Sequence, residues 1–265
     1  MEHVVLITGG SGGIGLALAK RFAKNNFNLL LVARNPEHLE EAKQAILAVN
    51  PQVSVVLLPK DLRDENAAED IYGFCREQGL EVEVLCNNAG VGTYGPFAES
   101  FVEDNENIIQ IDIVTMVNLT YLFIHDMLER KHGYILNTAS TAAFQCGPFM
   151  DVFYASKAFV LSFTEGLHEE TLESGVKVSA LCPGPTRTNF AKTSGLERTK
   201  IASIFPLLDP EKVADAAFRG LMKNKAVILL GSKNKIRAFD TRLFSRSFIR
   251  SRMRDMLRPL DKKKK

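Results

Sequence analysis

The sequence lacks several features that would assign it to a specialised class of protein. Its four cysteines, Cys75, Cys86, Cys146 and Cys182, include no CxxC pair, so zinc and redox motifs are disfavoured and free thiols are expected. No apolar run approaches the roughly 18 residues that cross a bilayer. The first residues lack the charged and apolar regions of a signal peptide, so we expect a cytoplasmic protein.

What is present is the composition of an ordinary globular protein with an uneven distribution of charge. The 265 residues are 46% hydrophobic and 24% charged, which excludes collagen, a wholly disordered chain and a disulfide miniprotein. Residues 233–265 hold thirteen Lys and Arg against three Asp, so the preceding part is mildly acidic although the whole chain carries +2. The chain is therefore not a general nucleic-acid binder, and any contact with a polyanion should involve the basic tail.

Short apolar runs alternate with helical patterns over residues 1–232. Asn35 followed by Pro36 is typical of a helix start, with a capping Asn and Pro at the first helical position. Continuous apolar strands between helices indicate a parallel sheet covered on both faces, a doubly wound α/β fold of the Rossmann type with about seven strands. The expected strands are residues 4–7, 29–32, 53–58, 82–85, 135–136, 176–181 and 226–230.

A glycine-rich segment lies between the first expected strand and the helix that follows it. Glycines there allow a tight turn and a close approach of the backbone to a diphosphate, and the helix terminus supplies free N–H groups and a positive dipole. The segment therefore predicts a dinucleotide-binding site. It reads Thr8-Gly9-Gly10-Ser11-Gly12-Gly13-Ile14-Gly15.

The end of the second expected strand bears on which dinucleotide binds. An NAD-type site offers an acid to the adenosine ribose about twenty residues after the glycines. This sequence has Ala33 and Arg34 there, and an arginine can pair with a 2′-phosphate. NADP(H) is therefore favoured over NAD(H). The alternative is a solvated surface arginine, since no other basic residue lies in the glycine segment.

With further motifs, the chain resembles the short-chain dehydrogenase/reductase family, and within it the NADP-linked bacterial reductases. The resemblance covers about residues 3–232. It implies the same Rossmann fold, a homodimer or homotetramer, and hydride transfer between a nicotinamide cofactor and a secondary alcohol or ketone. The further motifs are Asp61-Leu62, Asn87-Asn88-Ala89-Gly90, Ser140, Lys157 and Pro183-Gly184-Pro185-Thr186-Arg187-Thr188.

The resemblance also implies which residues bind the cofactor. Asp61 and Leu62 would lie near the adenine, residues 87–90 would support the floor of the site, and Lys157 would bind the nicotinamide ribose. With Arg34, the implied cofactor-binding residues are Gly9, Ser11, Gly12, Gly13, Ile14, Gly15, Asp61, Leu62, Asn87, Asn88, Ala89, Gly90, Lys157, Pro183, Gly184, Thr186 and Thr188.

The catalytic residues that the resemblance implies are only partly present. Ser140 would orient the substrate oxygen, and a tyrosine four residues before Lys157 would transfer the proton. Counting back from Lys157 and counting forward from Ser140 both reach Phe153, which has no hydroxyl. Because one helical residue turns a side chain by about 100°, the adjacent Tyr154 is interpreted as a packing residue.

The asparagine that anchors a water relay in the family is also replaced. Asp112 holds its position, and an ionised carboxylate accepts hydrogen bonds, does not donate them, and can pair with Lys157. Three explanations of Phe153 stay open: a deliberately introduced Tyr→Phe change, which we favour, a naturally inactive relative, or proton transfer by Tyr154 or water. An NADP(H)-dependent oxidoreductase is the leading function, and a non-catalytic NADP(H)-binding interaction protein is the alternative.

Apolar and aromatic residues flank these positions, which favours a hydrophobic substrate such as a steroid, a bile acid or an acyl chain. Each of them alone is at least as easily explained as a packing residue. No metal site is predicted. The candidate substrate residues are Tyr94, Phe97, Phe144, Cys146, Phe149, Phe190 and Phe205.

The basic tail, residues 233–265, places apolar residues at mostly helical spacing among seven arginines. A basic amphipathic helix suits an anionic membrane surface or an acidic partner. We favour the other interpretation, a helix that docks on its own subunit or on a dimer partner. Related proteins associate through the helices that hold Asp112 and Lys157, which is the expected interface here.

Overall fold

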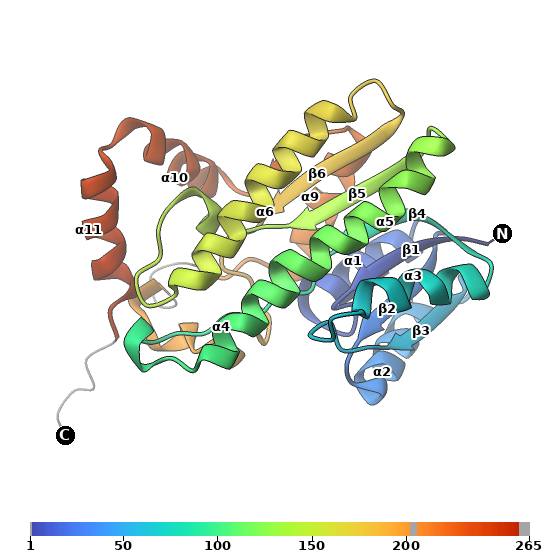
Figure 1. The fold of residues 1–265 in the computed structure, drawn as a ribbon, viewed down its shortest axis with the longest axis horizontal. Coiled ribbons are helices and arrows are strands. Elements are labelled where there is room, and N and C mark those ends of the chain that lie inside the picture. Colours follow the sequence, from blue (N-terminus) through green and yellow to red (C-terminus); the bar gives the residue numbers. More distant parts are fainter. Residues whose placement is uncertain (1, 202–205, 260–265) are drawn as a thin grey trace.

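Seven parallel strands form the centre of the protein (Figure 1), in the order β3-β2-β1-β4-β5-β6-β7. The computed structural model describes residues 2–201 and 206–259. Each strand overlaps one expected from the sequence, so the predicted doubly wound α/β fold is confirmed. The strands are β1 (Glu2–Thr8), β2 (Asn28–Ala33), β3 (Val55–Pro59), β4 (Leu80–Asn87), β5 (Gly133–Thr138), β6 (Val176–Cys182) and β7 (Val227–Leu229).

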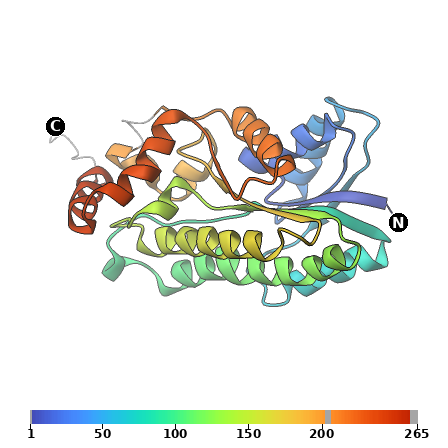
Figure 2. The same cartoon turned by 90° about the horizontal axis from the view of Figure 1, so that it is seen from above.

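Helices cover both faces of the sheet, which Figure 2 shows in edge view. Side chains of β2 alternate between the two cores: Leu31 belongs to one and Leu30 to the other, and both are fully buried. Burial on both faces is why the strands read as continuous apolar runs. One layer holds α1 (Gly13–Ala23), α2 (Pro36–Leu47) and α9 (Pro210–Met222), and the other holds α3 (Ala67–Glu77), α5 (Met116–Glu129) and α6 (Asp151–Glu170).

The predicted start of α2 is confirmed at the level of single atoms. The Asn35 side chain accepts a hydrogen bond from the backbone N–H of His38 at 3.0 Å, and Pro36 is the first helical residue. The shorter elements follow β4, β5 and β6 along the chain. They are η1 (Phe97–Glu99), α4 (Val102–Ile109), the π-helical turn η2 (Gln110–Thr115), η3 (Thr141–Phe144), α7 (Phe190–Thr193) and η4 (Leu196–Arg198).

The helix formed by α4, η2 and α5 is longer and more apolar than the sequence suggested. From Val102 to Glu129 it is long and apolar enough to cross a membrane, although no single apolar run in the sequence has that length. Half of its most apolar window is buried inside the protein, with Leu119 and Phe123 packed in the core beside β4 and β5. These contacts are those of a core helix in a layered domain.

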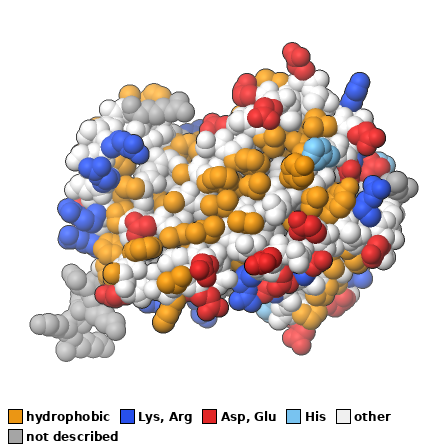
Figure 3. Space-filling model, viewed as in Figure 1, with side chains coloured by type: hydrophobic (Ala, Val, Ile, Leu, Met, Phe, Trp, Pro, Cys, Tyr) orange, Lys and Arg blue, Asp and Glu red, His pale blue; other side chains and the backbone are white. Residues whose placement is uncertain are grey.

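The outer surface of α5 and α6 carries an apolar face. Figure 3 shows hydrophobic side chains gathered over these two helices. Tyr121 and Leu128 on α5 and Phe159 on α6 are among the exposed large apolar residues.

Three of the four cysteines are buried, whereas Cys146 is exposed. Burial raises the pKa of the Cys75 thiol to about 12. All four are free.

The tail forms two helices, α10 (Ser232–Leu243) and α11 (Arg246–Leu257), at one end of the molecule (Figures 1 and 2). In α11, Ile249, Met253 and Leu257 are buried against Met150 and Tyr154 of the same chain. Their spacing of four residues places them on one side of the helix. In the described residues α11 therefore packs on its own subunit.

Candidate cofactor and active site

A groove runs along the carboxyl ends of the strands. The chain continues from β1 toward β2 on one side of the sheet and from β4 toward β5 on the other, and ligands bind at such a point in open α/β sheets. It encloses about 490 Å³. The residues that line the groove are far apart in the sequence, and the fold brings them together. Among the predicted positions it is lined by Gly9, Ser11, Gly12, Gly13, Ile14, Arg34, Asn88, Ala89, Gly90, Ser140, Phe153, Lys157, Pro183, Gly184, Thr186, Thr188 and Phe190.

The glycine turn at one end of the groove has the shape that a diphosphate needs. Gly9 and Gly13 have positive φ angles of 65° and 54°, which side chains rarely adopt. A Cβ on Gly15 would lie 2.2 Å from the carbonyl oxygen of Gly9, so only glycine allows this close approach. A Cβ on Gly12 would meet nothing within 4 Å, and no described side chain caps the amino end of α1. The first N–H groups of α1 are thus available to an anion.

Asn88 ties this turn to the sheet. Its side-chain amide donates to the carbonyl oxygen of Thr8 at 3.0 Å, while the Thr8 hydroxyl accepts from the backbone N–H groups of Asn88 and Ala89. Asn87 lies beneath the groove and does not line it. Its amide donates to Thr120 and Asn137, so it joins β4 to α5 and β5.

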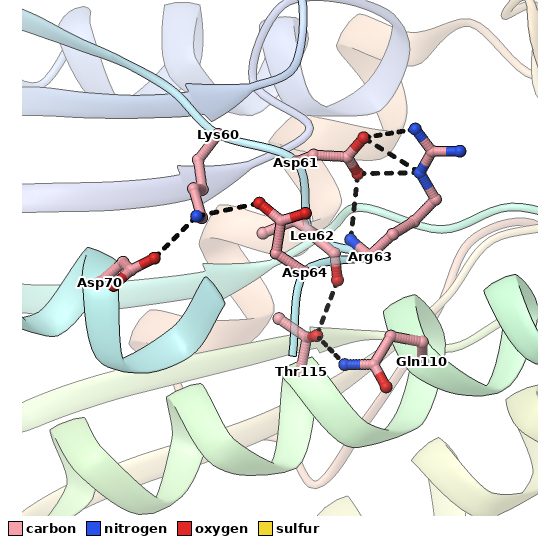
Figure 4. Close-up of polar contacts among 8 residues, drawn as sticks. All are labelled: Lys60, Asp61, Leu62, Arg63, Asp64, Asp70, Gln110 and Thr115. Atoms are coloured by element: carbon pink, nitrogen blue, oxygen red, sulfur yellow. Dashed lines mark hydrogen bonds and ion pairs between the residues drawn. The ribbon is translucent and has the colours of Figure 1, made fainter. Parts of the chain in front are cut away.

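The pair Asp61-Leu62 is not among the residues that line the groove. Figure 4 shows the polar contacts that these two residues make. Both oxygens of Asp61 accept from the Arg63 guanidinium, the shortest contact being 2.6 Å. This hydrogen bonding from Arg63, helped by the charge of Arg34, holds the pKa of Asp61 below its usual value. The carbonyl oxygen of Leu62 accepts from Thr115 at 2.9 Å, which fixes the loop on η2. Asp61 therefore places a second arginine near Arg34.

At the other end of the groove, Asp112 and Lys157 form a buried ion pair. The Lys157 Nζ lies 2.9 Å from Asp112 Oδ2 and also donates to the carbonyl oxygen of Thr138 at 3.3 Å. Asp112 further accepts from the Ser156 hydroxyl and from the backbone N–H of Val91, each at 3.0 Å. Three donors surround one carboxylate, which is what a buried charge requires.

Phe153 lines the groove beside this ion pair. Its ring lies 5.6 Å from Lys157 Nζ and 5.1 Å from the Phe190 ring, and the side chain is buried. Ser140 lines the same groove, and its hydroxyl oxygen accepts from the backbone N–H of Ala142 at 3.1 Å. The ring of Phe153 offers no group that donates or accepts a proton.

Tyr154 packs, as the helix geometry predicted. Its ring stands edge-on to Phe153, with centroids 6.0 Å apart, and fills the space beside Gly147, where an added Cβ would lie 2.1 Å away. Burial raises the pKa of the Tyr154 hydroxyl. A phenol that is harder to ionise is a poorer general base at neutral pH.

Comparisons with known proteins agree with this geometry. Residues 3–199 match the family described as short chain dehydrogenase. The chain belongs to the short-chain dehydrogenase family. It is 29% identical over 240 residues to the ketoacyl reductase HetN of a Nostoc species, covering 90% of this chain and 82% of the relative. It is 34% identical over 222 residues to a fatty acyl-CoA reductase of Acinetobacter baylyi, covering 83% and 73%.

A solved structure of the family has the same fold along nearly the whole chain. The short-chain dehydrogenase of Sphingobium yanoikuyae in complex with NADPH superposes with a TM-score of 0.80 at 28% identity, covering 95% of this chain and 96% of that one. This short-chain dehydrogenase is thus of an oxidoreductase family that acts on alcohols and ketones with a nicotinamide cofactor.

The candidate substrate residues of the dehydrogenase fall into separate places. Phe190 lines the groove, Phe144 and Cys146 line a second cavity, and Phe97 is exposed on η1. Tyr94 and Phe149 pack with α11 and α6 in one apolar cluster. These placements follow from tertiary contacts that the sequence does not encode locally. Phe205 lies outside the described residues.

Two residues that hold the dehydrogenase site together were missed by sequence reasoning. Ser156 donates to Asp112, and Arg63 holds Asp61. The signal for Arg63 was its place directly after Asp61-Leu62, and that for Ser156 its place beside Lys157. Gln145, a candidate pocket residue from its place between Ser140 and Lys157, lines both the groove and the second cavity.

Proposed function

We propose that this dehydrogenase is an NADP(H)-dependent oxidoreductase that interconverts a secondary alcohol and a ketone on a hydrophobic substrate. One observation carries the proposal: a single groove joins the glycine turn and Arg34 at one end to Ser140 and Lys157 at the other. A bound nicotinamide would supply or accept the hydride there. The free amino end of α1 and the glycines would hold its diphosphate, and Lys157 its ribose.

The preference for NADP(H) rests on charge at the adenosine end. Arg34 is exposed and lines the groove, and Arg63 lies close by through its contact with Asp61. Guanidinium groups bind phosphate through paired hydrogen bonds, whereas an acid would be needed for the ribose of NAD. The NADPH complex of the Sphingobium relative supports the same choice.

At the reacting end the chain orients the substrate but lacks a direct proton carrier. Ser140 Oγ would donate to the substrate oxygen, and Met150, Phe153 and Phe190 give the groove around it an apolar wall. Lys157 Nζ also lines the groove, but Asp112 and Thr138 already hold it, and the Tyr154 hydroxyl is buried. Without the tyrosine hydroxyl we expect turnover to be lower by about 10² to 10⁴.

The substrate class follows from the apolar walls and from the relatives. A ketoacyl reductase and a fatty acyl-CoA reductase are among the curated relatives. The bulky-bulky ketone specific alcohol dehydrogenase of Comamonas testosteroni shares the fold at 25% identity with a TM-score of 0.75. Ketones with a long acyl chain or a fused-ring body, such as a steroid or bile acid, fit this set best.

The residues at the reacting end of the groove favour a second function. Phe153 removes the proton carrier, and the Asp112 carboxylate balances the charge of Lys157 within a dry site. Such a chain would bind NADP(H) without turning it over and would act as an interaction protein.

The experiment that separates the two functions restores one oxygen atom. Phe153→Tyr should raise the rate of NADPH oxidation with a panel of hydrophobic ketones by roughly tenfold or more. Phe239→Tyr is the matched control, because Phe239 is exposed on α10, away from the groove lining and from the apolar face of α5 and α6, and the change should leave the rate unchanged. No increase for Phe153→Tyr with any ketone would overturn the oxidoreductase function and favour the binding protein.

We also propose a homodimer or homotetramer in the cytoplasm, assembled through the apolar face of α5 and α6. Tyr121, Leu128 and Phe159 are exposed there, and burying them would remove apolar surface from water. Light scattering should give a multimer for the native chain, and Tyr121→Glu should shift it toward the monomer. A native monomer at micromolar concentration would contradict this assembly.

A further inference from the structure

A second cavity lies beside the groove and shares part of its wall. It encloses about 490 Å³ between the segment around η3, the first turns of α6 and the two tail helices. Gln145 and Tyr154 line both cavities, and the tight packing against Gly147 fixes the Tyr154 ring. The two cavities therefore adjoin at Gln145 and Tyr154, close to the reacting end of the groove.

The charge of the second cavity is positive. Arg246 and Arg250 of α11 line it one helical turn apart, Thr241 adds a hydroxyl, and Asp151 is the one carboxylate among its described lining residues. Neither arginine forms an ion pair with another residue that the structure describes. Two guanidinium groups thus line the cavity without an ion-pair partner among the described residues.

The helix that carries these arginines is held in place at both ends. The Ser245 hydroxyl accepts from the backbone N–H of Phe248 at 3.3 Å, which caps its amino end. The Tyr94 hydroxyl donates to the carbonyl oxygen of Leu257 at 2.6 Å at its carboxyl end. Between them Ile249 and Met253 are buried in the apolar cluster. The backbone positions of the two arginines are therefore fixed relative to the groove, as a binding site requires.

We propose that the second cavity binds the phosphate-bearing part of an acyl thioester, such as the coenzyme A ester of a 3-oxo acid. The guanidinium forks of Arg246 and Arg250 match phosphate oxygens, and the apolar walls accept the adjoining chain. The substrate carbonyl then lies in the groove beside Ser140. This proposal rests on the proposed function, because it assigns a substrate class to the same reacting site.

The test compares two ligands with the same acyl chain. The full-length protein, saturated with NADP⁺ so that the groove cannot take up coenzyme A as a nucleotide, is titrated calorimetrically with dodecanoyl coenzyme A. It is then titrated with the dodecanoyl thioester of N-acetylcysteamine, which has no phosphate. We expect the coenzyme A ester to bind tighter by roughly tenfold or more. The variant Arg246→Gln/Arg250→Gln should remove this difference and leave the affinity for the neutral thioester unchanged.

The matched control is Arg252→Gln/Arg254→Gln, which removes two positive charges from the same helix at positions that do not line the cavity. It should keep the preference for the coenzyme A ester. Equal losses in the two variants, no preference in the native protein, or no binding of either thioester would overturn the site. NADPH binding, measured separately, tells this failure from a failure of the proposed function: its loss would refute the function, and its retention would refute only the second cavity.

Discussion

The two ends of the groove differ in how far their residues match those expected for a short-chain dehydrogenase. At the cofactor end, the glycine turn, the open amino end of α1 and Arg34 have the form that the proposed dinucleotide site requires. At the reacting end, two positions depart together: Phe153 lacks a hydroxyl, and Asp112 introduces a buried negative charge. The proposed cofactor contacts are thus kept, whereas the positions for proton transfer are changed.

The departures at the reacting end are linked through Lys157. Its ammonium group would lower the pKa of a tyrosine at position 153 if its charge were free to act. Here Asp112 lies 2.9 Å from that ammonium and balances it. The explanation favoured from the sequence, a deliberately introduced Tyr→Phe change, concerns Phe153 alone. The ion pair that Asp112 forms with Lys157 is a second departure, which acts on the same ammonium group.

The largest effect is expected when both departures are reversed together. The double variant Phe153→Tyr/Asp112→Asn should gain more turnover than the combined gains of the two single variants. The reason is that the tyrosine then lies beside a Lys157 whose positive charge no carboxylate neutralises. We expect the double variant to gain a large part of the 10² to 10⁴ or so that a general acid contributes. The rising limb of the pH profile for alcohol oxidation should move to lower pH by about one unit relative to Phe153→Tyr alone.

The control for this prediction is the melting temperature. Asp112→Asn removes one partner of a buried ion pair, so Lys157 keeps the Thr138 carbonyl as an acceptor but loses its counter-charge. Purely additive rates with an unshifted pH profile, in folded variants, would show that Asp112 has only a structural role.

A smaller effect tests the cofactor end. Gly15→Ala should destabilise the free protein by about 1 to 3 kcal/mol, because its Cβ would meet the Gly9 carbonyl oxygen at 2.2 Å. Gly12→Ala should leave the unfolding free energy of the free protein nearly unchanged, since no protein atom lies within 4 Å, and yet weaken NADPH binding. Urea unfolding and fluorescence titration measure the two quantities. If Gly12→Ala bound NADPH normally, the diphosphate would lie elsewhere.

The choice between the two dinucleotides should change by a smaller factor. Arg34→Ala should weaken NADPH binding by roughly tenfold, as expected for a charge-assisted hydrogen bond at an exposed site, and leave NADH binding unchanged. NADH is the internal control, because it lacks the 2′-phosphate. A parallel loss for both would show that Arg34 contacts another part of the dinucleotide.

The smallest effect concerns Asp61. Since Arg63 lowers its pKa in the folded protein, this contact stabilises the fold above the ordinary carboxyl pKa of 3.8 and is lost as the pH falls through the lower folded value. Arg63→Ala should therefore reduce stability at neutral pH and flatten the loss of stability below pH about 4. Arg76→Ala, an exposed arginine on α3, is the control. Identical acid unfolding of the native protein and Arg63→Ala would contradict the pairing.

The sequence predicted the sheet and the tight glycine turn because local patterns encode them. Continuous apolar runs mark strands buried on both faces, and Asn35-Pro36 marks a helix start whatever surrounds it. The glycine segment is equally local: its conformation depends on residues adjacent in the chain. Even the register of Phe153 followed from counting, since a regular helix fixes the spacing to Lys157.

The substrate side is built from long-range contacts that local patterns do not give. The Tyr94 hydroxyl, for example, donates to the carbonyl oxygen of Leu257, 163 residues away. Asn87, expected to support the floor of the cofactor site, lies beneath the groove and joins β4 to α5 and β5. The position of α11, and with it the second cavity, depends on the packing of Ile249, Met253 and Leu257 against residues distant in the sequence. No local sequence pattern predicts these contacts.

The most direct test of the account is a calorimetric titration of the native protein with NADPH and with NADH. The account predicts that NADPH binds, and binds more tightly than NADH by about tenfold, although Phe153 keeps turnover low. If neither dinucleotide bound the folded protein, the groove would not be a cofactor site, and the missing hydroxyl would have no bearing on its chemistry.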